Sequence, residues 1–180
     1  MLDFNFKGIG DKFKDKIQRL MKQINERNKH YAFSFIYPGE PASDVRPRKG
    51  MHGFYDPRSK EKRKMEKFIK TLLTEEDLPL AGKKGPVEEL NVTFYITPPK
   101  KVTESKTKKF LYDIEFVNPL TRPDLDNYLK LLMDVGNDIL WYDDSQCFNI
   151  SMSKRYSQNP RTEVYMKYRK SKVDFRILNN

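Results

Sequence analysis

Segments with the two-residue period of a β-strand alternate along this chain with segments that have the 3.6-residue period of an α-helix. The predicted strands are residues 31–37, 87–97, 111–116, 146–155 and 162–169. The predicted helices are residues 11–28, 57–73 and 124–135. Segments 38–53, 76–86 and 98–110 are predicted loops, the last of them charged and mobile. This mixture predicts an α/β or α+β fold, in which helices pack on a mixed sheet.

The length of 180 residues suits one domain with short additions. We expect residues 1–29 to form a basic N-terminal extension, residues 30–172 the main domain, and residues 173–180 a tail. The apolar stripe of the extension runs from Phe13 through Ile17 and Ile24. It could pack on the domain, on a second subunit or on DNA, and packing on the domain is the most common fate of such a stripe.

Rare residue types exclude several kinds of site. With one cysteine and two histidines, the chain cannot form an internal disulfide framework or a cysteine zinc cluster, and a histidine-rich metal site has little room. No apolar run reaches the ~18 residues of a membrane span. The opening residues MLDFNFKGIGDKF contain no apolar core of a secretory signal. We therefore expect a soluble, cytoplasmic protein with no membrane partner.

The net charge of +10 favours a polyanionic partner, most often a nucleic acid. The charge is uneven, because residues 46–70 carry ten Lys or Arg against three acids, and residues 151–172 carry seven against one. Residues 111–150 instead carry eight acids against two basic residues. A divalent cation bound there would let a phosphate backbone approach. The alternative is that these carboxylates are only helix caps and surface charges.

The stretch RPDLDNYLKLL gathers several of these groups on one predicted helix. Asp124 follows a proline and is a natural N-cap. Asp126 and Lys130 are four residues apart, so they share a face, away from the stripe of leucines that begins at Leu125. The pair Asp143-Asp144 lies at a later turn, and the return of the chain could place Asp144 beside Asp124.

Carboxylates without histidine are the ligands that Mg²⁺ prefers. A nearby lysine could stabilise charge that develops on a phosphate. The alternatives are a plain cap, a surface ion pair and an ordinary turn. An EF-hand is excluded, because its sixth position would be Leu129 instead of glycine and its twelfth Val135 instead of glutamate.

The segment RPDLDNYLKLLMDVGNDILWYDDSQ resembles the RusA family of Holliday-junction resolvases, which carry a D-x-D-N-x-x-K motif followed by a D-D-x-Q turn. The upstream segment PGEPASDVRPRKGMHGFYDPRSKE is similar to the strand and loop at the start of that family's domain. A later strand that contains Lys154 also fits. The resemblance covers residues 31–169.

The resemblance implies a RusA-like fold and a Mg²⁺-dependent, structure-selective endodeoxyribonuclease, with Mn²⁺ as a possible substitute, that acts on branched DNA as a homodimer. It implies catalytic roles for Asp124, Asp126, Lys130 and Asp144, metal binding by Asp124, Asp126, Asp144 and Asp143, and DNA contacts by Arg46, Arg48 and Lys154. Two other functions stay open: a flap or fork nuclease of the same chemistry, and a non-catalytic protein that binds branched DNA. A small basic nuclease would suit a phage or prophage.

Three further predictions concern packing. Phe54 and Tyr55 are expected in the core. Cys147 is expected to be an inert buried thiol in a strand, and Trp141 to pack against the turn at Asp143.

Overall fold

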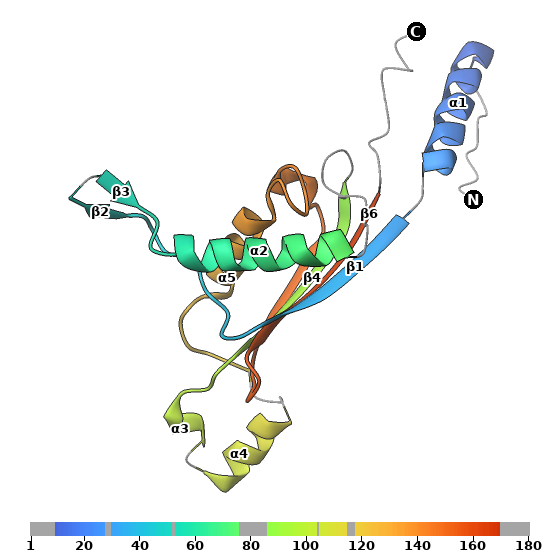
Figure 1. Ribbon diagram of the computed structural model, residues 1–180. Helices are drawn as coiled ribbons and strands as arrows, with labels where there is room; N and C mark the ends of the chain where they lie inside the picture. The colour runs from blue at the N-terminus through green and yellow to red at the C-terminus, as the bar shows by residue number, and fades with distance from the viewer. Residues whose placement is uncertain are drawn as a thin grey trace.

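A four-stranded mixed sheet organises the fold of this computed structural model (Figure 1). The structure describes residues 10–27, 30–51, 53–75, 86–103, 105–114 and 118–169. The sheet has the order β1-β6-β4-β5, formed by His30–Pro38, Arg161–Arg169, Val87–Ile96 and Ile150–Tyr156. Strand β6 is antiparallel to both β1 and β4, whereas β4 and β5 are parallel. The prediction of a mixed sheet with helices packed on it is confirmed.

Parallel neighbours need a long crossover, and here it joins β4 to β5. The crossover contains α3 (Lys100–Thr103), α4 (Lys106–Asp113), α5 (Leu125–Gly136) and a short 3-10 helix, η1 (Asp144–Gln146). Helices α3 and α4 form a small basic lobe beyond the end of the sheet. Helix α5 then returns along the chain to cover one face of the sheet (Figure 1).

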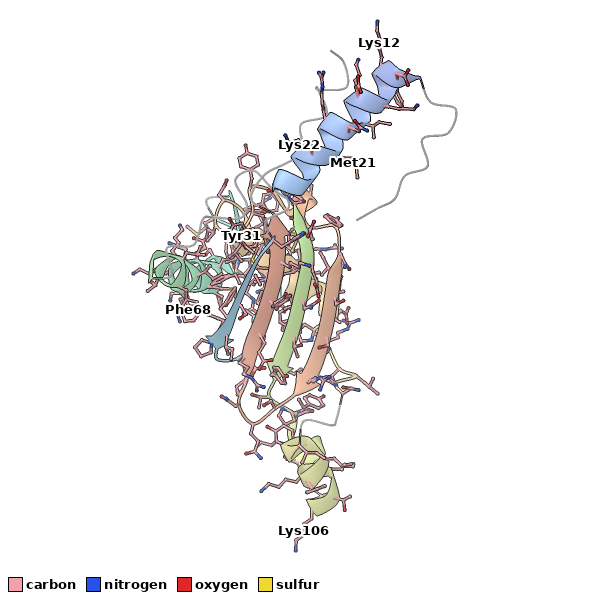
Figure 2. The ribbon with its side chains drawn as sticks, turned by 90° about the vertical axis from the view of Figure 1, so that its right-hand side faces the viewer. Lys12, Met21, Lys22, Tyr31, Phe68 and Lys106 are labelled. Carbon is pink, nitrogen blue, oxygen red and sulfur yellow. The ribbon has the colours of Figure 1, made fainter. Side chains whose placement is uncertain are left out.

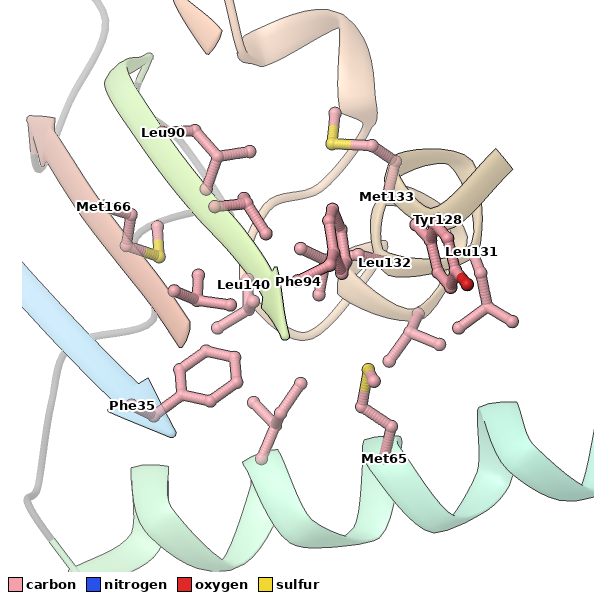
Figure 3. Packing of buried hydrophobic residues seen from close by; sticks show 14 of the residues in the cluster. Phe35, Met65, Leu90, Phe94, Tyr128, Leu131, Leu132, Met133, Leu140 and Met166 are labelled. Atoms are coloured by element: carbon pink, nitrogen blue, oxygen red, sulfur yellow. The ribbon is translucent and has the colours of Figure 1, made fainter. Parts of the chain in front are cut away.

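Helices α2 (Ser59–Glu75) and α5 cover one face of the sheet, and the core lies between them and the strands (Figure 3). Strand residues alternate between the two faces, so Phe35, Phe94 and Met166 point to the helices. Met65 from α2 and Leu132 from α5 complete this layer. Figure 2 shows the opposite face of the sheet, where none of the described helices lies in front of the strands.

Helix α1 (Asp11–Arg27) agrees with its prediction and projects beyond the start of β1 (Figures 1 and 2). Phe13 on α1 is more than half exposed. The proposed domain limits at residues 29 and 172 fall outside the described residues and stay predictions. None of the helices in the described ranges is long and apolar enough to span a membrane.

The predicted loop 98–110 is wrong where α3 and α4 form, and the predicted strand 111–116 is wrong at 111–113, which belong to α4. Residues 104, 115 and 116 lie outside the described part. The Ser105 side chain accepts a hydrogen bond from the Lys108 amide and so caps α4. The lysines that suggested a mobile loop are also good helix formers. Residues 76–85, within another predicted loop, lie outside the described part.

The predicted loop 38–53 contains one strand of a small hairpin, formed by β2 (Arg48–Gly50) and β3 (Gly53–Tyr55). The prediction that Phe54 and Tyr55 lie in the core is wrong: 77% of Phe54 and 51% of Tyr55 is exposed. Their aromatic side chains had suggested burial, but the hairpin that carries them projects away from α2 and α5 (Figure 1). Helix α2 begins at Ser59, two residues later than predicted.

The predicted apolar stripe of α5 is confirmed in part: Leu132 and Met133 are buried, whereas Leu125 and Leu129 are only partly buried. Tyr128 and Leu131, which the prediction left out of the stripe, are buried as well. Trp141 packs on Gly136 at the end of α5, and its Nε1 donates to the Met133 carbonyl (3.3 Å). Its packing against the turn at Asp143 stays a prediction. The strand predicted for 146–155 begins only at residue 150, because η1 occupies the preceding turn.

Candidate functional site

The N-terminus of α5 presents two exposed carboxylates. Asp124 is the N-cap, as predicted, with an extended backbone, but its side chain makes no capping hydrogen bond. Asp126 lies in the first turn and is exposed. Both carboxylates are therefore available to a ligand.

Lys130 lies one turn further along α5, where Asp44 fixes its ammonium group. The Lys130 Nζ is 3.0 Å from Asp44 Oδ2, and the Lys130 side chain is 64% exposed. The Asp44 amide donates to the Asn127 carbonyl (2.7 Å), so the loop before the hairpin lies directly against α5. Only 10% of the Asp44 side chain is exposed. Sequence reasoning missed Asp44, because no motif marks an acid in that loop.

Lys62 on α2 joins this loop to α5. Its Nζ is 3.5 Å from an oxygen of Asp44, 3.0 Å from Asp56 and 2.8 Å from Asp134. Burial lowers the pKa of Lys62, but hydrogen bonds and charges from Asp134 and Asp56 outweigh it, so the pKa lies above its usual value. The cation thereby connects both ends of the hairpin segment to the helix that carries Lys130.

The two residues of the Asp143-Asp144 pair differ in their contacts: Asp143 caps a helix, whereas Asp144 is exposed. Asp143 caps η1: its side chain accepts from the Ser145 amide (2.9 Å), and Gln146 accepts from the Asp143 amide (3.2 Å). Hydrogen bonds from the Ser145 hydroxyl and amide hold the pKa of Asp143 below its usual value. The Asp144 side chain is exposed at the first position of η1.

The structure does not gather the predicted ligands at one point. Within the described ranges, no three His, Cys, Asp or Glu side chains are placed to hold a metal ion together. The assignment of Asp124, Asp126, Asp144 and Asp143 to a metal therefore stays a prediction. Its chemistry fits Mg²⁺, which takes carboxylate oxygens, commonly from one or two residues, and keeps several waters. The exposure of Asp124 and Asp126 satisfies that requirement.

Lys154, a predicted DNA contact, is engaged with the backbone that precedes Asp124. Its Nζ donates to the carbonyls of Thr121 (2.7 Å) and Pro123 (2.8 Å). Two residues along β5, the hydroxyl of Tyr156 lies 3.1 Å from that of Thr121. Strand β5 thus holds the loop from which α5 begins. The predicted contact of Lys154 with DNA stays a prediction.

Arg46 and Arg48, the other predicted DNA contacts, are exposed in and beside β2. Cys147 lies beyond η1 in an isolated bridge to Val87 and is only half-buried. Burial, followed by the charge of Asp144, raises the pKa of Cys147 to about 12. A thiol with this pKa is almost entirely protonated near neutral pH, in agreement with the expected inertness.

Two comparisons with known proteins bear on this site. The family model described as Endodeoxyribonuclease RusA matches residues 38–167, more than two thirds of the chain and all the predicted site residues. The chain is also similar to the uncharacterized protein YqaN of Bacillus subtilis (strain 168), with 36% identity over 134 residues. That alignment covers 74% of this chain and 94% of YqaN. The resemblance seen in the sequence is confirmed, and it indicates the nuclease and resolvase class. The chain belongs to the RusA family of endodeoxyribonucleases.

Proposed function

We propose that this protein is a Mg²⁺-dependent endodeoxyribonuclease that resolves four-way DNA junctions by paired, symmetric nicks. The observation that carries the proposal is the N-terminus of α5, where Asp124 caps the helix without using its carboxylate. Asp126 and Lys130 follow on the same helix, and both are exposed. Family membership supplies the nuclease class.

In this proposal, Asp124, Asp126 and Asp144 hold the cation, with Asp143 beside them. A bound divalent ion supplies a Lewis acid for the scissile phosphate and lowers the pKa of an attacking water. Lys130 stabilises negative charge on the phosphate or on the leaving oxygen. Asp44 supports that role because it fixes the ammonium group on the exposed side of α5.

The second part of the proposal is a homodimer. A two-fold dimer presents two equivalent sites, which suits a substrate that needs one nick in each of two strands. Basic segments on both sides of the acidic stretch would bind the phosphate backbones.

An end-labelled four-way junction tests the proposal directly. Purified protein is incubated with the junction in Mg²⁺, in Mn²⁺ and in EDTA, beside the Asp126→Asn variant. We expect symmetric nicks that require the metal, and a variant that binds the junction but does not nick it. Normal nicking by Asp126→Asn would refute the assignment of the site.

A non-catalytic protein that binds branched DNA is the second candidate, and one observation favours it: among the described residues, no three His, Cys, Asp or Glu side chains are placed to hold a metal ion together. It predicts tight, salt-sensitive binding without nicks in either metal. A flap or fork nuclease of the same chemistry would instead cut those substrates faster than junctions, so rates on junction, flap, fork and linear duplex separate the candidates.

A further inference from the structure

The β2–β3 hairpin presents large apolar side chains to solvent. Phe54 is 77% exposed, Tyr55 is 51% exposed and Met51, in the turn, is 96% exposed. The hairpin projects beyond the N-terminal end of α2, away from the sheet and its core (Figure 1). Surface aromatic rings gathered on one short element mark an interaction site more often than isolated exposed residues do.

Each exposed ring has a cation opposite it on the neighbouring strand. Arg48 pairs with Tyr55, and Lys49 pairs with Phe54. Residues directly opposite in an antiparallel pair project from the same face of the hairpin. Each face therefore carries one aromatic ring and one positive charge. No acid occurs between Asp44 and Asp56, so the hairpin is uniformly basic.

Glycines at the turn keep this arrangement narrow. Gly53 has a φ of +114°, a conformation that suits glycine. A Cβ on Gly50 would lie 3.3 Å from Cδ1 of Tyr55, so this ring rests against the bare backbone of β2. The hairpin is thus a narrow two-stranded element whose aromatic side chains stay at the surface.

The base of the hairpin is fixed beside the proposed catalytic lysine. On one side, Asp44 binds the Asn127 carbonyl and the Lys130 ammonium. On the other side, Asp56 binds Lys62, which also binds Asp134 of α5. The segment 44–56, which contains the hairpin, is thus attached at both ends to α5 and α2, so the base of the hairpin has a defined position relative to Lys130.

We propose that this hairpin inserts at the branch point of DNA and stacks Phe54 and Tyr55 on unpaired or unstacked bases, while Arg48 and Lys49 contact the adjacent phosphates. Aromatic rings interleaved with cations are the surface that binds single-stranded nucleic acid, since every base offers a face for stacking. Fully paired duplex keeps its bases stacked and gives the rings no partner. The inference rests on the proposed function, because it assigns branch recognition to the hairpin of that same nuclease.

The test measures binding in EDTA, so that it does not depend on cleavage. Fluorescence anisotropy gives the affinity of wild type and of Phe54→Ala/Tyr55→Ala for a four-way junction and for a duplex of the same length. A 2-aminopurine at the branch point reports stacking through quenching of its fluorescence. The matched control is Phe110→Ala, because Phe110 is 62% exposed beside the lysines of α4.

We expect the double variant to bind the junction at least about fivefold more weakly, since one base stacked on an aromatic ring corresponds to roughly 5- to 150-fold in affinity. Its duplex affinity and its salt dependence should stay as in wild type, because no cation is lost. The change in 2-aminopurine quenching on binding should disappear in the double variant and persist in Phe110→Ala.

Unchanged junction affinity and quenching would overturn the inference, and so would an equal loss on junction and duplex. Light scattering of both variants tests whether the hairpin contacts a second subunit instead of DNA. A lower particle mass for the double variant alone would show such a subunit contact and overturn the inference. A wild-type protein that binds the junction with quenching but never nicks in Mg²⁺ would refute the proposed nuclease function and leave the hairpin inference standing.

Discussion

Replacement of Lys62 by methionine should loosen the segment that carries Asp44 and the hairpin. The Lys62 side chain is 18% exposed and lies within 3.5 Å of carboxylate oxygens from Asp44, Asp56 and Asp134. Methionine preserves most of the aliphatic packing and removes the charge. The three carboxylates then face one another without the cation, and the Asp44 side chain, which is 10% exposed, keeps its ion pair with Lys130.

The magnitude follows from these contacts. Removal of one partner of a fully buried ion pair costs roughly 3–5 kcal/mol, and a pair at the surface contributes about 0–1 kcal/mol. Lys62 lies between these limits, so we expect a loss of about 2–3 kcal/mol in the free energy of unfolding. For a chain of this size, that corresponds to a fall in Tm of roughly 4–12 °C.

Urea denaturation followed by circular dichroism measures this loss, with thermal unfolding as a second readout. The matched control is Lys64→Met, because Lys64 is an exposed lysine on the same helix; surface substitutions usually change stability by less than about 0.5 kcal/mol. If Lys62→Met were no less stable than Lys64→Met, the network would not hold the loop to α5. The pKa of Lys62 is raised in the folded protein, so its stabilisation is fully present below pH ~10.4 and declines as the pH rises through the folded pKa.

Three further predictions follow from single contacts. Gly136→Ala places a Cβ in the ring of Trp141, so overpacking should destabilise the fold by about 1–3 kcal/mol in a urea titration, despite the better helix propensity of alanine; a more stable variant would contradict this packing. A backbone hydrogen bond from Arg58 and the Lys62 ammonium hold the pKa of Asp56 below its usual value. Asp56→Asn should therefore be less stable than wild type at pH 7, and the difference in the free energy of unfolding should shrink below pH ~4. A difference that stays constant from pH 7 to pH 3 would show that the ionised Asp56 carboxylate does not stabilise the fold. Lys154→Met should lower the single-turnover nicking rate roughly 10- to 100-fold, because the loop before Asp124 is displaced. Junction affinity and its dependence on salt should stay unchanged. If the slope of log affinity against log salt concentration instead fell by about one, Lys154 would contact a phosphate.

Periodicity predicted the helices and strands that pack on the core, because burial of one face imposes a repeat on the sequence. The alternation in 87–97 gave β4 within one residue of its end, and α5 was misplaced by only one residue at each end. The helices α3 and α4 were missed because α4 packs little of its surface: Phe110 is exposed, and Tyr112 is the only buried residue among those of α4 whose burial is described. A helix held by its own cap and propensity leaves a weak periodic signal.

The candidate site was predictable where it lies within one motif. Asp124, Asp126 and Lys130 occupy a single helix, so their spacing fixes their mutual placement. Asp44 and Lys62 could not be predicted, because their roles depend on contacts between α5, α2 and a loop that are far apart in sequence. The same holds for Lys154, whose hydrogen bonds to the carbonyls of Thr121 and Pro123 depend on how β5 aligns with β4.

The strand order has a consequence for how the protein is made. β6, the last strand among the described residues, lies between β1 and β4 and provides the pairing of β1 in the sheet. Until residues 161–169 are synthesised, the first strand has no place in the sheet, and the crossover that bears Asp124, Asp126, Lys130 and Asp144 is attached to an incomplete core. Such long-range pairings form late, because chain closure must precede them. The sheet that positions α5 is therefore completed only when β6 pairs with β1 and β4.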